Sequence, residues 1–419
     1  MPYRKSALPN GIRLVTETMP HVRSVAVGIW VETGSRVEPE ARGGISHLIE
    51  HLVFKGTASR SAEEIARAID SVGGQMDAFT TKEQTCFYVS VLDEHLPLAV
   101  GLLTDILREP LFAPDDIEKE KAVVLQEIKM VEDTPDDLIH DLFAERVWAN
   151  HPLGRPILGR WDVVRGFDRA TLLDYFQREY VPGRIVIAVA GHAEHEQVAD
   201  LFAAGFDGWG RPTVPHALTA PRLHPGVHAV NKPLEQVHLV MGLPGLSDVA
   251  PERYALYLLN DVIGGSMSSR LFQEIRERQA LVYSVHSGQQ AYRDTGLFYI
   301  YAGTDPGSLG KVIDAVVREL RALKKDGLTA EELRRAKDHL KGSLTLSLES
   351  TSSRMNRLAR QEMRFGNFLS MDEVLAAIDT VRPEDVDALV HRVLDEEQLS
   401  MLALGAVEGQ ELSRDLLRA

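Results

Sequence analysis

An internal repeat is the feature that most constrains how this chain can fold. The segment 208–226, GWGRPTVPHALTAPRLHPG, is dense in glycine and proline, lacks regular periodicity and divides the 419 residues almost in half. The strand-like run that begins at Ser24 has a counterpart that begins at Gln236, and the helical sequence from Phe112 has one from Leu328. The copies share few identities but keep order and spacing, which is typical of two copies of one structural unit.

Both copies alternate short apolar strands with amphipathic helices of ordinary length. Strands grouped with several consecutive helices favour an antiparallel or mixed sheet that is covered by helices. We therefore expect an α+β fold with two homologous domains in tandem, each a mostly antiparallel sheet with helices packed on one face. The predicted boundaries are 1–207 for the N-terminal domain, 208–226 for the linker and 227–419 for the C-terminal domain.

Composition narrows the class of function. The chain has 46 Lys and Arg against 61 Asp and Glu, a formal net charge of −15, and this excess of acid disfavours nucleic acid as a partner. The sequence shows neither a signal-peptide pattern nor an apolar run long enough to span a membrane, so we expect a cytoplasmic location. Cys86 is the only cysteine, which excludes an intrachain disulfide and a thiolate-rich metal site. Any metal must be bound by His, Asp or Glu.

The sequence GGISHLIEHLVFKGT, residues 43–57, carries the first candidate ligands. His47 and His51 are four residues apart and stack on one side of a helix, and Glu50 borders the same side. Two imidazoles at this spacing can share one metal, with the carboxylate placed to take a proton from water. The order HxxEH is a zinc-hydrolase signature. A polar helix face that binds no metal is the alternative that this short motif leaves open.

Catalytic zinc usually takes three protein ligands, so a third is expected elsewhere. In the helical sequence PDDIEKEKAVVLQEIKMVED, Glu120 and Glu127 share a stripe with the apolar residues Val124 and Val131. A carboxylate that faces a core normally has a cation or metal as its partner. A solvated acidic helix face is the alternative.

The repeat separates these alternatives without any alignment of relatives. The five polar residues of the two helices correspond in the second copy to Leu259, Val262, Ile263, Ala336 and Ser343. If the polar residues served the fold alone, the second copy should tolerate similar ones. Their joint loss favours one five-residue site in the first half and a catalytically silent second half.

The chain resembles the inverzincin zinc peptidases of the pitrilysin and mitochondrial processing peptidase superfamily. The resemblance rests on HLIEH, VVLQEIKM, HPLGRPILG and IGGSMSSRLFQEIRERQALVYSV, and it covers nearly the whole chain. Length and layout are most similar to the small bacterial members and the processing-peptidase subunits. The resemblance implies a zinc-dependent endopeptidase that acts on peptides or unfolded polypeptide segments. It also implies that each chain forms half of a clamshell.

The resemblance implies a role for each residue of the candidate site. His47, His51 and Glu127 would bind Zn²⁺, and Glu50 would be the general base. Glu120 would lie behind the metal ligands and orient a ligand histidine.

Further residues would contact the substrate. The strand in GGQMDAFTTKEQTCFYV is similar to the family's edge strand that pairs with the substrate main chain, which selects Asp77, Ala78, Phe79 and Thr80. Asp77 stands where many relatives have asparagine.

In the second half, Arg270 and Tyr283 match an arginine and a tyrosine that reach the substrate near the metal. Tyr283 would donate a hydrogen bond to the developing oxyanion, and Arg270 would hold a substrate carbonyl or carboxylate. Ala280, in RQALVY, stands where the family usually has glycine.

The resemblance also implies an assembly, in which two chains close around a chamber. A homodimer is the expected form, and a heterodimer with a zinc-less homologue is the alternative. Two other classes of function remain open. One is a non-catalytic or partner-dependent peptide-binding subunit of the same fold, whose metal motif would typically be damaged. The other is a metal-dependent hydrolase of other substrates.

Overall fold

The computed structural model describes residues 3–210 and 213–417, which form two compact units. Unit 1 is assembled from Met1–Met130, Arg155–Leu218 and Ser347–Phe368. Unit 2 is assembled from Val131–Gly154, Thr219–Leu346 and Leu369–Ala419. Each unit has one sheet and its own hydrophobic core.

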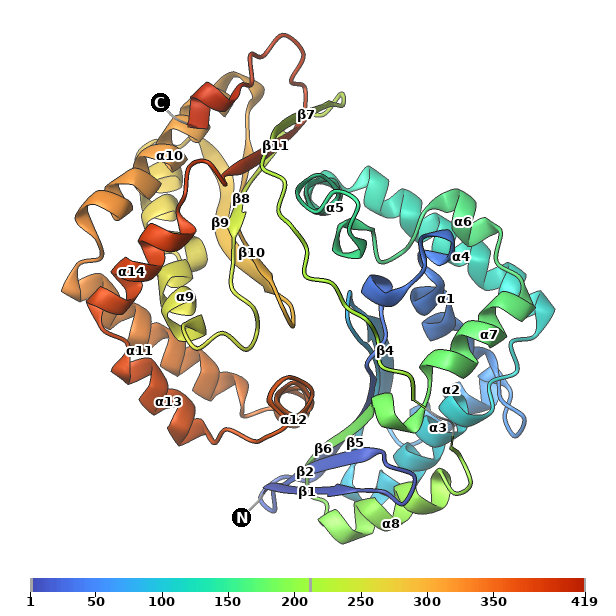
Figure 1. Cartoon of the computed structure of the whole chain (residues 1–419). Coiled ribbons are helices and arrows are strands. Elements are labelled where there is room, and N and C mark those ends of the chain that lie inside the picture. The colour runs from blue at the N-terminus through green and yellow to red at the C-terminus, as the bar shows by residue number, and fades with distance from the viewer. Residues whose placement is uncertain (1–2, 211–212, 418–419) are drawn as a thin grey trace. The chain divides into compact units, whose positions relative to one another are not determined.

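Unit 1 contains a six-stranded sheet in the order β1-β2-β6-β3-β5-β4 (Figure 1). The strands in chain order are β1 (Tyr3–Ala7), β2 (Arg13–Thr18), β3 (Ser24–Val31), β4 (Gln75–Thr80), β5 (Thr85–Leu92) and β6 (Ile185–Gly191). The pair β2/β6 is parallel and every other neighbouring pair is antiparallel. Strand β4 is an edge strand, so one side of its backbone has no partner strand within this sheet.

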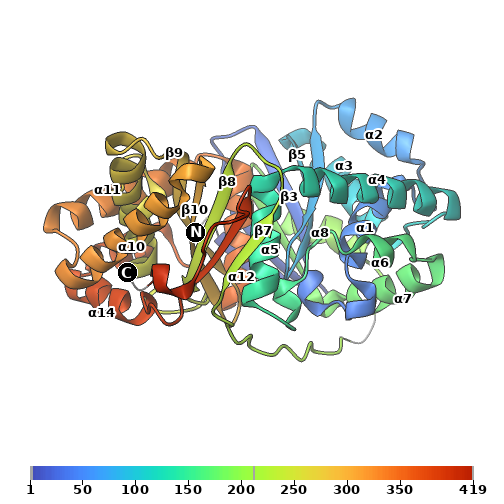
Figure 2. The same ribbon diagram turned by 90° about the horizontal axis from the view of Figure 1, so that it is seen from above.

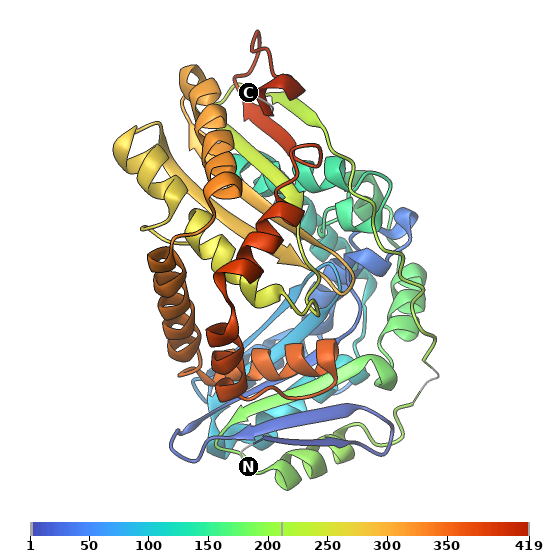
Figure 3. The ribbon, with the colours of Figure 1, turned by 60° about the vertical axis from the view of Figure 1, so that its left-hand side comes forward.

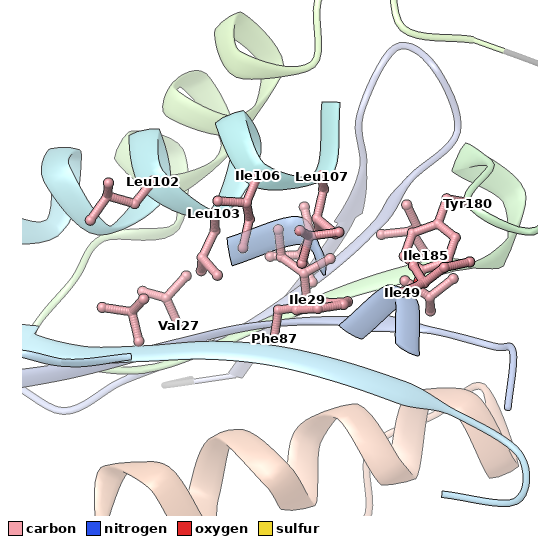
Figure 4. Close-up of a cluster of buried hydrophobic side chains, with 14 of the residues drawn as sticks. Val27, Ile29, Ile49, Phe87, Leu102, Leu103, Ile106, Leu107, Tyr180 and Ile185 are labelled. Atoms are coloured by element: carbon pink, nitrogen blue, oxygen red, sulfur yellow. The ribbon is translucent and has the colours of Figure 1, made fainter. Parts of the chain in front are cut away.

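One face of this sheet is covered by helices of the first half of the chain. They are α1 (Ile45–Leu52), α2 (Ala62–Asp70), α3 (Leu96–Arg108), α4 (Pro114–Asp133), α6 (Trp161–Arg165), α7 (Arg169–Glu179) and α8 (His195–Gly205). Alternate strand residues such as Val27, Ile29 and Phe87 meet the apolar stripe of α3, which includes Leu103 and Ile106 (Figure 4). This burial follows from the two periodicities, 2 for the strands and 3.6 for the helices.

Helix α12 (Thr351–Phe365) covers the other face of the same sheet, where it runs beside β6 and β3 (Figure 3). Its residues Met355 and Leu358 are at most 1% exposed and pack against Trp30. Gly28 makes room for this contact, since a Cβ there would lie 2.4 Å from the Trp30 ring and 3.0 Å from the Met355 sulfur.

Unit 2 contains a five-stranded sheet in the order β7-β11-β8-β10-β9. Its strands are β7 (Val227–Asn231), β8 (Val237–Pro244), β9 (Val282–Ala291), β10 (Gly296–Thr304) and β11 (Ser400–Gly405). The pair β7/β11 is parallel and the rest are antiparallel. This is the arrangement of β2-β6-β3-β5-β4 in unit 1, so the predicted α+β class and the repeat of one mostly antiparallel sheet are confirmed.

The helices of unit 2 are α5 (Pro135–Val147), α9 (Arg253–Asn260), α10 (Leu309–Asp326), α11 (Ala330–Ser347), α13 (Met371–Thr380) and α14 (Pro383–Val393). Two π-helical segments, Asp261–Gly265 and Phe272–Arg278, extend the region after α9. Helix α10 packs on one face of the sheet, and α5 packs on β8 and β11 (Figure 2). There the Phe143 ring occupies the space above Gly242, where a Cβ would lie 2.5 Å from it.

The compact units are not continuous in sequence, because α5 of the first half belongs to unit 2 and α12 of the second half belongs to unit 1. The sequence boundaries at residues 207 and 226 stay predictions. The predicted linker includes residues 211 and 212, which lie outside the described residues, and 213–226 contains neither helix nor strand. Within the described part of the chain, no helix has the length and apolar character needed to cross a membrane.

The packing of α5 against the sheet of unit 2 can be tested with Phe143→Ala. Phe143 is 1% exposed, so its truncation should lower the free energy of unfolding by about 3–5 kcal/mol. The measurement is urea unfolding followed by circular dichroism. The control Val123→Ala, at a position 43% exposed on α4, should stay within about 0.5 kcal/mol of the parent. Equal effects of the two substitutions would contradict this packing.

Candidate metal centre

Helix α1 places two histidines on one side because its other side is buried. Four of its residues are at most 1% exposed and belong to the core of unit 1: Ile45, Leu48, Ile49 and Leu52. His47 and His51 lie one turn apart on the remaining side, with ring centroids separated by 4.7 Å. The apolar pattern of the helix therefore fixes the direction in which the histidines point.

The start of α1 is held by a buried carboxylate. Glu38 is 3% exposed and accepts hydrogen bonds from the backbone N–H groups of Gly44 and Ser46, at 2.7 and 2.8 Å. Burial raises the pKa of Glu38, and these hydrogen bonds oppose that shift. Gly44 has φ of 92°, and a Cβ there would lie 2.5 Å from the Leu158 carbonyl oxygen. A residue with a side chain would therefore displace the helix that carries the histidines.

Helix α4 brings a carboxylate to the two imidazoles. Its apolar residues Ile117, Val124 and Ile128 are buried in the core of unit 1. The Oε2 atom of Glu127 lies 3.7 Å from Nε2 of His47 and 3.7 Å from Nε2 of His51. One ligand atom from each of the three residues falls within 4.8 Å of the others.

This donor set fits a zinc ion. Two imidazole nitrogens and a carboxylate oxygen are a common ligand set of catalytic zinc, and tetrahedral bonds of about 2.0–2.1 Å place ligand atoms about 3.4 Å apart. The observed 3.7 Å spacings are close to that value. Among the described residues, Glu127 Oε2 is buried and has no hydrogen-bond partner. A buried, unpartnered carboxylate oxygen between two imidazoles is the arrangement that a bound cation would satisfy.

The protonation state of His47 also suits a ligand. Burial, with a smaller contribution from the neighbouring His51, lowers the pKa of His47 to about 4. The imidazole is therefore neutral near pH 7, which is the form that binds metals. Its Nδ1 atom is buried and has no hydrogen-bond partner in the described chain, whereas ligand histidines commonly donate from their second nitrogen.

His51 has the supporting partner that His47 lacks. Its Nδ1 lies 3.2 Å from Oε2 of Glu120, and because a carboxylate only accepts, Nδ1 donates and Nε2 remains available as a ligand atom. The other oxygen of Glu120 lies 2.9 Å from Nζ of Lys55. Glu120 is 6% exposed, so these contacts partner a largely buried charge.

Glu50 lies on the same helix with a different set of contacts. It is 9% exposed, and its Oε2 accepts a hydrogen bond from the hydroxyl of Thr80. Burial raises the pKa of Glu50, while the Thr80 hydrogen bond and the nearby His51 oppose the rise. Glu50 is thus a third carboxylate in the site, in addition to Glu120 and Glu127. Its hydrogen-bond donor is the uncharged hydroxyl of Thr80.

Strand β4 carries the four residues expected to contact substrate, and they differ in their surroundings. Asp77 is exposed, and its carboxylate accepts hydrogen bonds from its neighbour's backbone N–H at 2.8 Å and from the Tyr88 hydroxyl at 3.3 Å. Ala78 is half-buried against the core, and the Phe79 ring lies 6.3 Å from that of Tyr88. Thr80 points toward α1, where it meets Glu50.

Arg270 and Tyr283 belong to unit 2. The guanidinium of Arg270 pairs with both oxygens of Glu332, at 2.7 and 2.8 Å, and donates to the carbonyl of Gly327 at 3.0 Å. Tyr283 is 79% exposed, with the Arg276 guanidinium 5.5 Å from its ring centroid. Arg270 is therefore committed to an ion pair within its own unit, whereas the Tyr283 hydroxyl is on the surface.

The loop before Tyr283 adopts, at Ala280, a backbone conformation that favours glycine. Ala280 has φ of +53°, the left-handed region, and its N–H bonds back to the carbonyl of Arg276 at 3.2 Å, at the end of a π-helical segment. Glycine is the residue usually found at such a helix end. The alanine keeps the conformation that a glycine would favour and carries its steric cost.

The structure thus brings together His47, Glu50, His51, Glu120 and Glu127 in unit 1. Sequence reasoning missed three features of this site: the Lys55 contact with Glu120, the Glu38 cap of α1 and the Thr80 contact with Glu50. Lys55 follows His51 by four residues, which is a helical spacing that could have suggested a contact on the same side. The other two depend on chain segments that meet only in the fold.

Comparisons with known proteins agree on one family. Residues 13–160 match the family described as Insulinase (Peptidase family M16), and residues 166–340 match the Peptidase M16 inactive domain. The chain is 43% identical to "Uncharacterized zinc protease YmxG" of Bacillus subtilis, over 93% of this chain and 95% of that protein. It is 41% identical to "Uncharacterized zinc protease SCO5738" of Streptomyces coelicolor, over 98% of this chain and 91% of that protein.

Solved structures show the same fold. A protease from Helicobacter pylori superposes with a TM-score of 0.90 at 20% identity, covering 96% of this chain and 99% of that one. The chain belongs to the M16 family of peptidases, and the predicted resemblance to the pitrilysin and processing-peptidase superfamily is confirmed. The residues from His47 to Glu127 fall in the segment that matches the peptidase description, and Arg270 and Tyr283 fall in the segment that matches the inactive domain.

The left-handed conformation of Ala280 gives a first prediction for this region. Ala280→Gly should change the free energy of unfolding by less than about 0.5 kcal/mol, because relief of the Cβ clash offsets the flexibility of unfolded glycine. Ala66→Gly, at an exposed position inside α2, should cost about 1 kcal/mol. Urea unfolding measures both, and an equal loss at the two positions would show that residue 280 is not in the left-handed region in solution.

The Arg270–Glu332 pair gives a prediction about pH. Burial alone would raise the pKa of Glu332, but hydrogen bonds from Arg270 and Thr329 outweigh it and lower the pKa to about 2. A lowered folded-state pKa contributes stability that is present above the unfolded value of about 4.3 and is lost as pH falls toward 2. Urea midpoints at pH 5 and pH 3 should therefore differ less in Glu332→Gln than in the parent. An equal pH dependence in both would contradict the pair.

Proposed function

We propose that this chain is a zinc metalloendopeptidase that hydrolyses peptides or unfolded polypeptide segments. The observation that carries the proposal is the convergence of His47, His51 and Glu127, whose ligand atoms approach to 3.7 Å beside the buried carboxylate of Glu50. The zinc-protease names of relatives about 40% identical support the same chemistry.

Each residue of the site has a proposed task. His47 and His51 bind through Nε2 and Glu127 through Oε2, and Glu120 keeps the ring of His51 oriented. A zinc ion at this position would supply Lewis-acid chemistry, which polarises the peptide carbonyl and makes water a competent nucleophile near neutral pH. Glu50 accepts a proton from the attacking water and returns it to the leaving amine nitrogen as the C–N bond breaks.

Strand β4 is the proposed docking element for substrate. Its outer edge has no partner strand in the sheet of unit 1, so backbone groups between Gln75 and Thr80 can pair with an extended peptide. Asp77, Ala78 and Phe79 would then flank the peptide, and recognition would depend mainly on its main chain. This mode of binding suits unfolded segments, since a folded protein rarely offers a free strand.

Arg270 and Tyr283 differ in how available their side chains are to a substrate. Tyr283 is 79% exposed, so its hydroxyl is free to donate to a substrate oxyanion. Arg270 would contact a substrate carboxylate or carbonyl only by sharing or leaving Glu332. We further propose a homodimer that encloses the substrate in a chamber, with a zinc-less homologue as the alternative partner. The cytoplasmic location also stays a prediction.

Glu50→Gln tests the proposed function directly. The variant should retain about one zinc per chain and lose at least about 100-fold in kcat on a quenched fluorogenic peptide, because the general base is gone while the ligands remain. His51→Ala should lose both the metal and the activity. Zinc content is measured by mass spectrometry of the purified protein, and removal of zinc by a chelator should abolish cleavage reversibly.

Glu63→Gln is the matched control, since its side chain is 72% exposed on α2 and it should cleave as the parent does. If the parent holds zinc and cuts no peptide in a broad library, the chain alone is a binding or partner-dependent subunit. If Glu50→Gln cleaves as well as the parent, the assignment of the base is wrong.

A further inference from the structure

Thr80 lies at the end of the edge strand and contacts the general base. Its hydroxyl donates to Oε2 of Glu50, and no other residue of the described chain donates a hydrogen bond to that carboxylate. The alternation of β4 explains the contact: Met76 and Ala78 pack against the core that contains α1, and Thr80 shares their face. A residue expected to line the substrate strand therefore points at the base.

The hairpin that carries Thr80 is fastened at its turn. Residues 81–84 connect β4 to β5, and the backbone N–H of Arg36 donates to the carbonyl of Lys82 at 2.7 Å. The N–H of Ser35 donates to the carbonyl of Thr81 at 3.3 Å. These bonds tie the turn to the loop that follows β3.

A buried ionic clamp holds the same turn. One oxygen of Glu83 lies 2.6 Å from Nη1 of Arg36, and the other lies 2.5 Å from Nη2 of Arg364. The three side chains are 8%, 1% and 10% exposed, in the order Glu83, Arg36 and Arg364. Arg364 therefore supplies one of the cations that pair with this buried carboxylate, and the clamp favours one position of the turn.

Arg364 comes from α12, the helix that the second half of the chain contributes to unit 1. Among the other ion pairs of this helix is the one between Glu362 and Lys5 of β1, at 2.7 Å. The Arg364 pair reaches the hairpin of the edge strand, whereas the Glu362 pair joins α12 to β1. The same helix thus provides both a contact to test and a matched control.

We propose that Thr80 is a positioning residue that holds Glu50 in place, and that Arg364 fixes Thr80 through Glu83. The hydroxyl of Thr80 donates a hydrogen bond to Oε2 of Glu50. The other carboxylate oxygen of Glu50 is therefore the one that accepts the proton from the attacking water. Helix α12 therefore connects the second half of the sequence to the base. The inference rests on the proposed peptidase function for its kinetic test and on structure alone for its second test.

The kinetic test compares Thr80→Val with Thr80→Ser. Val removes the hydroxyl at nearly constant volume and should lower kcat about 10- to 100-fold, the effect of losing a hydrogen bond to a charged group. KM should change by less than about twofold, zinc content should stay near one per chain, and Ser should restore kcat to within about threefold of the parent. An unchanged kcat in Thr80→Val, or a rise in KM alone, would overturn the positioning role.

A double-mutant cycle tests the Thr80–Glu50 contact without any activity. The melting temperatures of zinc-loaded parent, Thr80→Val, Glu50→Met and the double variant should be non-additive, because each single change removes the same hydrogen bond. Additive shifts would overturn the contact. If the parent cleaves no peptide, the proposed function fails and this cycle still decides the inference.

The clamp is tested with Arg364→Met against Lys5→Met. Arg364→Met should lower kcat with KM and zinc content unchanged, and combining it with Thr80→Val should lower kcat no further than Thr80→Val does. Lys5→Met, which removes an ion pair between α12 and β1, should keep kcat within about twofold of the parent. If Arg364→Met does not fold, Glu83→Gln replaces it with the same expectation. A normal kcat in these clamp variants, or an equal loss in Lys5→Met, would overturn the link through α12.

Discussion

The meeting of Glu127 with His47 and His51 is the constraint on which the rest of unit 1 depends. The buried oxygen of Glu127 sits 3.7 Å from an imidazole nitrogen of His47 and of His51, so two separate helices must be held against each other at one point. Helix α4 is fixed by the burial of Val124, and α1 is fixed at its start by Glu38. The packing of the core of unit 1 therefore also sets the positions of the candidate metal ligands.

The repeat shows what such a site requires beyond the fold. Both units have the same strand order around one parallel pair, yet Leu259, Val262 and Ile263 fill the core of unit 2 where unit 1 has its polar residues. The second copy keeps the helix and the sheet, but apolar side chains that pack in its core stand where the first copy has metal-ligand candidates. The second copy therefore lacks the metal-ligand set of the first, which agrees with the match of the second segment to an inactive domain.

Each sheet also depends on a helix from the other half of the chain. Phe143 of α5 fills the space above Gly242 in unit 2, and Met355 of α12 packs on Trp30 in unit 1. The amphipathic pattern predicted that these helices exist and which face is apolar. It could not predict which sheet they cover, because two similar apolar sheets offer the same hydrophobic surface to either helix. The sequence boundaries of the repeat and the compact units therefore differ.

By itself, the sequence determined the α+β class, the repeat and the side of α1 on which His47 and His51 lie, because helical and strand periods are local properties of the chain. The stripe in α4 also marked Glu120 and Glu127 as candidate ligands, since a carboxylate among apolar residues needs a partner, and the family resemblance chose Glu127 between them. Only the tertiary structure decided that Thr80 meets Glu50 and that Arg364 reaches the hairpin of β4. Those contacts join segments far apart in sequence, and burial of charge and backbone pairing selects them only once the sheet has formed.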